Sequence, residues 1–150
     1  SLDAVIREVI HKYAKIMIRR KIRMHYEKTE VTVISDEKWL AFVLEQLLSN
    51  AVKYTPEGEI TIEVREEPQH IWLEIRDTGI GIRSEDIPLV FEKGYTGFNG
   101  HEDKRSTGIG LYLCREVLQK LGHTIQIQSE MGVGTNVKVG FSRDVIDFRD

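Results

Sequence analysis

The chain has 150 residues, the length of one ordinary domain, and a content of 41% hydrophobic and 30% charged residues is typical of a globular protein. This composition excludes a disordered chain, a collagen and a coiled-coil rod, and no apolar run approaches the roughly 20 residues of a transmembrane helix. The net charge of −3 argues against a nucleic acid as the main partner, and the single cysteine, Cys114, excludes an internal disulfide and a thiolate-rich metal site.

The first third of the chain combines helical and extended patterns. Residues 1–20 are predicted to form a helix, because hydrophobic residues recur there at helical spacing. Two short strands are predicted around residues 22–27 and 31–34, which are rich in β-branched and aromatic residues. A long helix follows, which Ser35-Asp36-Glu37 caps and Pro56-Glu57-Gly58 closes. Its predicted buried stripe contains Leu40, Leu44, Leu47 and Ala51.

Four further strands are predicted from alternating hydrophobic and polar residues. Residues 60–64 and 71–75 alternate strictly and are expected to pair in antiparallel fashion. Residues 124–129 and 135–141 are expected to form the last two strands, with Gly132-Val133-Gly134 in the turn between them.

A glycine-rich region separates these two pairs of strands. Seven glycines occur between residues 77 and 110, and helices are predicted around residues 85–91 and 109–121. Residues 92–107 form a connection that is too long and too rich in glycine for a simple link between two helices. We therefore expect this segment to be a lid.

The long predicted helix carries polar residues beside its buried stripe. Gln46, Asn50 and Lys53 share one face, because they are separated by four and three positions. An amide oxygen can bind Mg²⁺, and a lysine one turn further can meet a phosphate. Tyr54 could flank a base or a ribose. The same residues also suit a plain amphipathic helix with a polar border, so this face alone does not decide between the two interpretations.

A short motif, Asp77-Thr78-Gly79-Ile80-Gly81-Ile82, directly follows the predicted strand 71–75. A partly buried carboxylate at this place can accept a hydrogen bond from an exocyclic amine, and the glycines would let a flat ring approach the backbone. The alternative is an acidic turn without a ligand. The motif does not match a dinucleotide-binding fingerprint, because the third glycine is missing.

A second glycine motif, Thr107-Gly108-Ile109-Gly110-Leu111, opens the predicted helix 109–121. Free backbone N–H groups and the positive end of a helix favour an anion, and glycines allow a phosphate to approach closely. The motif is not a Walker A loop, since it lacks the Gly-Lys-Ser/Thr sequence. On its own it would equally suit a glycine-containing helix start.

The order of these motifs resembles the ATP-binding catalytic domain of bacterial two-component sensor histidine kinases. These kinases share a superfamily with gyrase, Hsp90 and MutL. The resemblance covers about residues 20–141, and the lid sequence is similar to that of the intramembrane-sensing, bacitracin-resistance subgroup. The segments that carry it are Leu47–Thr55, Asp77–Ile82, Val90–Gly94 and Ser106–Leu111.

This resemblance implies an α+β fold of the Bergerat type, a two-layer sandwich with a mixed five-stranded sheet under three helices. It implies ATP and Mg²⁺ as ligands, with Asn50 holding the metal, Lys53 meeting the phosphates, Tyr54 flanking the nucleoside and Asp77 reading the adenine amine. Gln46 and Asn50 are the implied catalytic residues. The other implied nucleotide-binding residues are Gly79, Gly81, Ile82, Phe91, Thr107, Gly108, Ile109, Gly110 and Leu111.

Gln46 departs from the family pattern, in which most kinases carry asparagine. The ATP-hydrolysing relatives carry a glutamate there to activate water, so the resemblance disfavours hydrolysis. None of the five histidines has the sequence context of a family phosphoacceptor. The alternative is a non-catalytic nucleotide-sensing module, that is, a degenerate kinase.

Because the chain begins with Ser1, we expect it to be part of a longer protein. We expect residues 1–20 to be a linker helix from a dimerisation domain, and residues 21–150 to be the catalytic domain. The implied partners are that phosphoacceptor domain and a response regulator. The expected whole protein is membrane-anchored and dimeric, with this part in the cytoplasm, whereas the isolated chain is expected to be monomeric and unable to phosphorylate itself.

Overall fold

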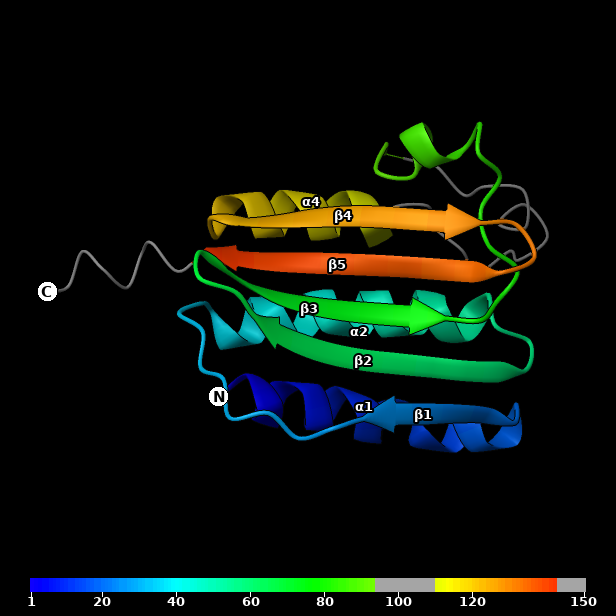
Figure 1. Ribbon diagram of the computed structural model, residues 1–150, viewed down its shortest axis with the longest axis horizontal. Helices are drawn as coiled ribbons and strands as arrows, with labels where there is room; N and C mark the ends of the chain where they lie inside the picture. Colours follow the sequence, from blue (N-terminus) through cyan, green and yellow to red (C-terminus); the bar gives the residue numbers. More distant parts are fainter. Residues whose placement is uncertain (94–109, 143–150) are drawn as a thin grey trace, which may run out of the picture.

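A computed structural model describes residues 1–93 and 110–142, which form two layers (Figure 1). One layer is a five-stranded sheet, and the other contains three α-helices that lie on one face of this sheet. This arrangement confirms the expected α+β fold. In chain order the elements are α1 Leu2–Arg19, β1 Ile22–Tyr26, α2 Glu37–Lys53, β2 Gly58–Glu66, β3 His70–Asp77, the 3₁₀ helix η1 Ile87–Leu89, α4 Gly110–Lys120, β4 His123–Glu130 and β5 Gly134–Ser142.

The sheet is mixed, as expected, and its strand order is β1-β2-β3-β5-β4. β1 pairs with β2 in parallel, and all other neighbours are antiparallel. As a result, β3 and β4 end, and β5 begins, on the same side of the sheet, at the edge that runs across the ends of the strands. α2 also ends there (Figure 1). This edge brings together segments that are more than 70 residues apart in the sequence.

The core lies between the sheet and the helices. The predicted stripe of α2 is confirmed, since Leu40, Leu44, Leu47 and Ala51 are all at most 5% exposed. Alternate residues of the strands meet this stripe, including Leu73 of β3 and Val139 of β5, which are fully buried. The opposite face of the sheet carries exposed polar residues such as Glu63, Gln126 and Gln128, so the period-two pattern of the sequence corresponds to one covered and one uncovered face.

α1 is packed into the same core. Its buried residues include Leu2, Ile6 and Val9, and Tyr26 of β1 donates a hydrogen bond to the Asp3 carboxylate near the start of the helix. The predicted helix over residues 1–20 is therefore confirmed. Its role as a linker from a dimerisation domain stays a prediction.

Two predicted elements are wrong. Residues 31–34 form no strand; instead Val31 and Val33 turn their side chains toward the core, and the Val31 carbonyl accepts a hydrogen bond from the Leu2 N–H at 3.2 Å. β1 is the edge strand of the sheet, and this segment passes to α2 without pairing with it. In place of an α-helix over residues 85–91 there is only η1, which contains Pro88. Short helical segments with proline commonly adopt this tighter form.

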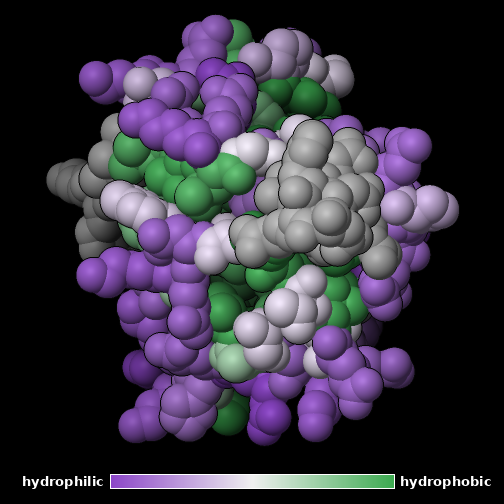
Figure 2. All heavy atoms as spheres, turned by 90° about the vertical axis from the view of Figure 1, so that its left-hand side faces the viewer, coloured by the Kyte–Doolittle hydropathy of each residue, from purple (hydrophilic) through white to green (hydrophobic). Residues whose placement is uncertain are grey.

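Figure 2 faces the end of the molecule opposite the edge where β3 and β4 terminate. Its surface shows hydrophobic patches between hydrophilic residues. Ile34, just before α2, and Trp39, in its first turn, are 43% and 49% exposed. This apolar surface is distant along the strands from the residues that sequence analysis selected for nucleotide binding.

Candidate nucleotide-binding site

The polar face of α2 lies at its C-terminal end, as the spacing of Gln46, Asn50 and Lys53 predicts. Asp36 caps the start of the helix, with its carboxylate accepting a hydrogen bond from the Trp39 N–H at 3.0 Å. Gln46 and Asn50 are half-buried, and neither side chain has a hydrogen-bond partner among the residues that the structure describes. The two amides are therefore available to bind a ligand.

Lys53 and Tyr54 end this helix side by side. The Lys53 ammonium nitrogen lies 5.3 Å from the centre of the Tyr54 ring, which is within the range of a cation–π contact. The backbone carbonyl of Tyr54 accepts a hydrogen bond from the Ile80 N–H at 3.0 Å. The end of α2 is thus joined directly to the segment that follows β3.

Gly79 makes this contact between the two segments possible. A Cβ atom at this position would lie 2.2 Å from the Tyr54 carbonyl oxygen, a distance that no side chain could adopt. The glycine therefore lets the segment 77–82 pack closely against the end of α2. This packing joins the segment that follows Asp77 to Tyr54, the residue that directly follows Lys53.

The Asp77 carboxylate is held in a fixed orientation at the end of β3. Its Oδ1 accepts hydrogen bonds from the backbone N–H of Gly79 at 2.9 Å and of Thr135 at 3.2 Å. Burial raises the pKa of this carboxyl group, and the two backbone donors partly offset that rise. Within residues 1–93 and 110–142, Oδ2 has no hydrogen-bond partner. Asp77 thus offers one oriented acceptor.

Two residues of the site, Thr135 and Ser129, were missed by the sequence analysis. In the sheet register Asp77 of β3 is opposite Thr135 of β5, which in turn is opposite Ser129 of β4. These three polar residues continue the alternate positions that farther along the strands carry Ile75, Val137 and Ile127. A polar residue that interrupts a buried alternating pattern could have revealed them.

A hydrogen-bond network joins the β4–β5 hairpin to segment 77–82. The Ile82 N–H donates to Ser129 Oγ at 2.8 Å, and the Gly132 N–H donates to the Ile80 carbonyl at 2.9 Å. Ser129 Oγ also lies 3.0 Å from the Gly134 carbonyl oxygen and 2.8 Å from Thr135 Oγ1. The hairpin therefore supports the segment from the side opposite α2.

Gly81 is needed for this contact. Its φ angle is +79°, and a Cβ atom there would lie 2.2 Å from the Glu130 carbonyl oxygen. Any other residue at this position would therefore strain the backbone, and its Cβ atom would collide with the hairpin.

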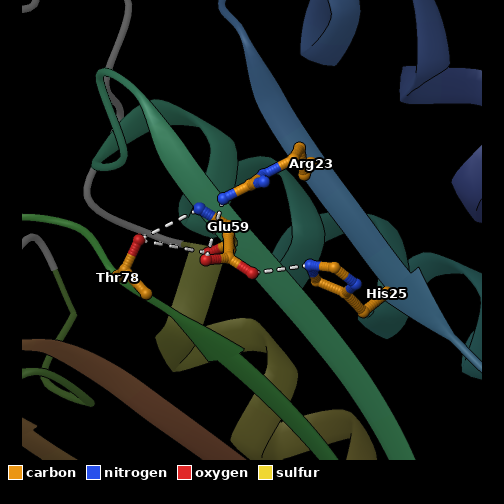
Figure 3. A network of polar contacts seen from close by, with 4 residues as sticks. All are labelled: Arg23, His25, Glu59 and Thr78. Atoms are coloured by element: carbon orange, nitrogen blue, oxygen red, sulfur yellow. Dashed lines mark hydrogen bonds and ion pairs between the residues drawn. The ribbon is translucent and has the colours of Figure 1, made fainter.

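Thr78 ties the same segment to the start of β2 (Figure 3). Its hydroxyl accepts a hydrogen bond from the Glu59 N–H at 3.0 Å, while its own N–H donates to the Glu59 carbonyl at 3.1 Å. The Glu59 carboxylate in turn contacts Arg23 at 3.2 Å and His25 at 2.6 Å, both on β1. Asp77 is thus followed by a residue that is anchored to the other half of the sheet.

Gln46 points to the start of α4. A Cβ atom on Gly110 would lie 3.0 Å from Gln46 Oε1, so the amide is close to the first residue of this helix. Leu111 is half-buried and packs against the core, and Phe91 has the Arg115 guanidinium carbon 5.4 Å from its ring centre. Thr107, Gly108 and Ile109 lie outside the described residues, as does the expected lid beyond residue 93.

The residues present fit a magnesium ion that arrives with phosphates. In the described part of the chain, no group of three or more His, Cys, Asp or Glu side chains could hold a metal. Mg²⁺ usually keeps several waters and takes only one or two protein ligands beside substrate phosphates. The unpartnered amide of Asn50 is a suitable oxygen ligand of this kind.

Comparison with known proteins decides the family. The sequence pattern of the family described as "Histidine kinase-, DNA gyrase B-, and HSP90-like ATPase" matches residues 35–144. The chain belongs to this family. The matched region contains Asn50, Asp77 and Thr135, so the residues brought together at the edge of the sheet lie within this ATPase domain.

Curated relatives of this ATPase domain are sensor kinases. The chain is 38% identical over 147 residues to the sensor histidine kinase YxdK and 45% identical over 135 residues to the sensor protein BceS, both of Bacillus subtilis. These alignments cover 94% and 90% of the chain but 44% and 40% of the relatives, so the chain spans less than half of their length. The expected resemblance to sensor kinases of the bacitracin-resistance subgroup is confirmed.

Solved structures share the fold of this ATPase domain. The mycobacterial sensor histidine kinase MprB superposes with a TM-score of 0.77 at 23% identity and covers 94% of this chain and 95% of its own. The catalytic domain of the histidine kinase ThkA gives a TM-score of 0.79 at 20% identity, covering 95% and 94%. In the described residues, no helix combines the length and apolar character needed to cross a bilayer.

Proposed function

We propose that this chain is the ATP-binding catalytic domain of a sensor histidine kinase, which delivers the γ-phosphate of ATP to a histidine on a separate domain. The observation that carries the proposal is the Asp77 carboxylate. Two backbone N–H groups hold its Oδ1, and its Oδ2 has no partner among the described residues, next to the end of α2. In a chain of this ATPase family, such an acceptor suits the exocyclic amine of adenine.

In the proposed reaction this domain positions ATP and neutralises its charge. Asn50 would hold Mg²⁺, and Lys53 would meet the phosphates as a point charge. When bound, Mg²⁺ supplies positive charge that stabilises the phosphoryl group during transfer. Asp77 would orient the base, so that the triphosphate extends along the polar face of α2 toward α4.

Gln46 favours phosphoryl transfer over hydrolysis. Its amide cannot accept a proton near neutral pH, and therefore it cannot serve as a general base that activates water. Gln46 lies near the start of α4, where the phosphates would bind. A side chain that supplies no general base there would preserve the γ-phosphate for an acceptor on another domain.

The implied partners follow from this role. The phosphoacceptor domain would belong to the same kinase, and a response regulator would receive the phosphate from it. The expected whole protein is a membrane-anchored dimer, in which this domain is cytoplasmic. No comparison supports the alternative of a non-catalytic nucleotide-sensing module, but Gln46 is the residue on which that alternative would depend.

Calorimetric titration with a non-hydrolysable ATP analogue tests the proposal. We expect saturable binding that is tighter with Mg²⁺, and we expect Asn50→Ala to remove most of the dependence on Mg²⁺. Gln126→Ala, which removes an exposed amide from the outer face of β4, should have no effect. A folded chain with no affinity for any purine triphosphate would refute the proposal.

Transfer to a separately supplied dimerisation domain then distinguishes a kinase from a sensing module. Labelled γ-phosphate should appear on the acceptor histidine of that domain. Tight ATP binding without any transfer in this assay would favour the non-catalytic alternative.

A further inference from the structure

Ser129 joins the segment 77–82 to the row of polar residues at the edge of the sheet. Its hydroxyl oxygen contacts the Ile82 N–H at 2.8 Å, the Gly134 carbonyl at 3.0 Å and Thr135 Oγ1 at 2.8 Å. Thr135 in turn donates its backbone N–H to Asp77 Oδ1 at 3.2 Å. Ser129 is therefore connected to Asp77 through one intermediate residue.

The number of protons in this network restricts how it can be arranged. A serine hydroxyl has one proton and two acceptor lone pairs. The Ile82 N–H occupies one lone pair, and the Gly134 carbonyl, which can only accept, takes the proton. The remaining contact is then satisfied only when Thr135 donates its own hydroxyl proton to Ser129. Thr135 Oγ1 is left with acceptor lone pairs in the row that contains the Asp77 carboxylate.

We propose that Ser129 is a positioning residue for base recognition, because it takes up the Thr135 proton and makes the Asp77–Thr135 row a set of acceptors. Such a row favours a purine that carries a hydrogen-bond donor at position 6. Adenine carries an amino group at position 6, whereas a 6-oxo purine presents an acceptor there. This inference rests on the proposed binding of adenine nucleotides at Asp77.

Loss of the Ser129 hydroxyl should therefore change selectivity as well as affinity. Without Ser129 as its acceptor, the Thr135 hydroxyl can rotate and present its proton to a ligand. A purely structural role would weaken the binding of all bases equally, since the hairpin would support the segment 77–82 less well. The ratio of two affinities separates these possibilities.

The experiment compares ADP and IDP, which share the sugar and phosphates and differ in the base. Dissociation constants are measured by calorimetry with Mg²⁺ for the unaltered chain, Ser129→Ala and Ser129→Thr. We expect Ser129→Ala to bind ADP about tenfold more weakly and IDP within about twofold of the original affinity, as for loss of one to two hydrogen bonds. Ser129→Thr, which retains a hydroxyl, should restore most of the preference for ADP.

Two further variants control for loss of structure. Ser35→Ala also removes a hydroxyl with a cross-segment contact, to His123 at 3.0 Å, but at the opposite end of β4. It should leave the ADP-to-IDP ratio unchanged. In a Thr135→Val background, Ser129→Ala should cause no further change in this ratio, because the proton that Ser129 controls is already absent.

The outcomes separate this inference from the proposed function. A chain that binds neither nucleotide contradicts the proposed function itself. A chain that prefers ADP, and whose Ser129→Ala variant weakens both nucleotides equally or neither, overturns only the role of Ser129. If Ser129→Ala does not fold, Ser129→Cys keeps the volume with a much weaker hydrogen-bonding group, and it should show the same loss of preference relative to Ser129→Thr.

Discussion

Asp77→Asn is the substitution that most directly tests how the site would recognise a base. The two backbone donors from Gly79 and Thr135 need an acceptor, so they should hold the amide oxygen of asparagine in the place of Oδ1. The amide NH₂ group must then occupy the place of Oδ2. The variant therefore retains the shape of the site and replaces its ligand-facing acceptor with a donor.

The expected loss follows from the hydrogen bond that is reversed. A hydrogen bond to a charged group contributes about 1.5–3 kcal/mol, so ATP should bind about 10- to 100-fold more weakly. GTP should lose much less affinity, since the amide can donate to its 6-oxo group. Calorimetric titration of the variant with non-hydrolysable analogues of both nucleotides measures the two losses. Equal losses for ATP and GTP would refute the argument that Asp77 reads the base.

Stability provides the control for this variant. Because burial raises the pKa of Asp77, its ionised form is disfavoured in the folded state relative to the unfolded state. The carboxylate therefore costs stability above its folded pKa, and a neutral asparagine removes that cost. The melting temperature of Asp77→Asn near neutral pH should be equal to or higher than that of the original chain. A large decrease would mean that the substitution disturbs the segment 77–82 rather than only its hydrogen-bonding character.

Three other predictions concern the glycine contact, a buried histidine and the missing acceptor. Gly81→Ala should lower stability by about 1–3 kcal/mol more than Gly122→Ala, because both φ angles are near +80° but only at Gly81 would an added Cβ atom lie 2.2 Å from a carbonyl oxygen. Similar losses in denaturant melts would contradict this. Burial lowers the pKa of His123, so stability should fall as the pH decreases from about 6.5 toward its folded pKa. A His123→Gln variant should show a flatter dependence of melting temperature on pH in that window, whereas His11→Gln, at an exposed position, should match the original chain. The isolated chain should incorporate no label from γ-labelled ATP, and a labelled histidine in it would show that one of its own histidines is an acceptor.

Local periodicity explains which parts of the fold could be predicted from the sequence. The stripe of α2 and the alternation of β2 to β5 depend only on residues close together in the chain, and these elements were correctly placed. The segment 31–34 has a strand-like composition, but in the structure the Val31 carbonyl accepts a hydrogen bond from the start of α1 and the segment pairs with no strand. Which of these contacts forms depends on residues distant in the sequence, and the composition of the segment does not contain that information.

The residues of the candidate site also fall into those that a local pattern identifies and those whose place depends on distant contacts. Asn50, Lys53 and Asp77 could be selected because each lies in a local pattern that suits a ligand. Ser129 and Thr135 interrupt a buried alternating pattern, but their place beside Asp77 depends on the cross-strand register, which sets Thr135 opposite Asp77 and Ser129 opposite Thr135. Register is fixed by pairing between distant segments, so the local sequence could mark these two residues as unusual but could not place them beside Asp77.

For the glycines after Asp77, packing within the protein gives a second reason why glycine is required, which the motif alone does not reveal. Sequence analysis assigned them to the approach of a flat ring. In the structure Gly79 lies against the end of α2 and Gly81 lies against the β4–β5 hairpin, and a side chain at either place would collide with a backbone carbonyl. The same two residues therefore hold the Asp77 segment between a helix and a hairpin that are distant in the sequence. The segment that follows Asp77 is thereby held from both sides, and two backbone N–H groups fix the orientation of the Asp77 carboxylate.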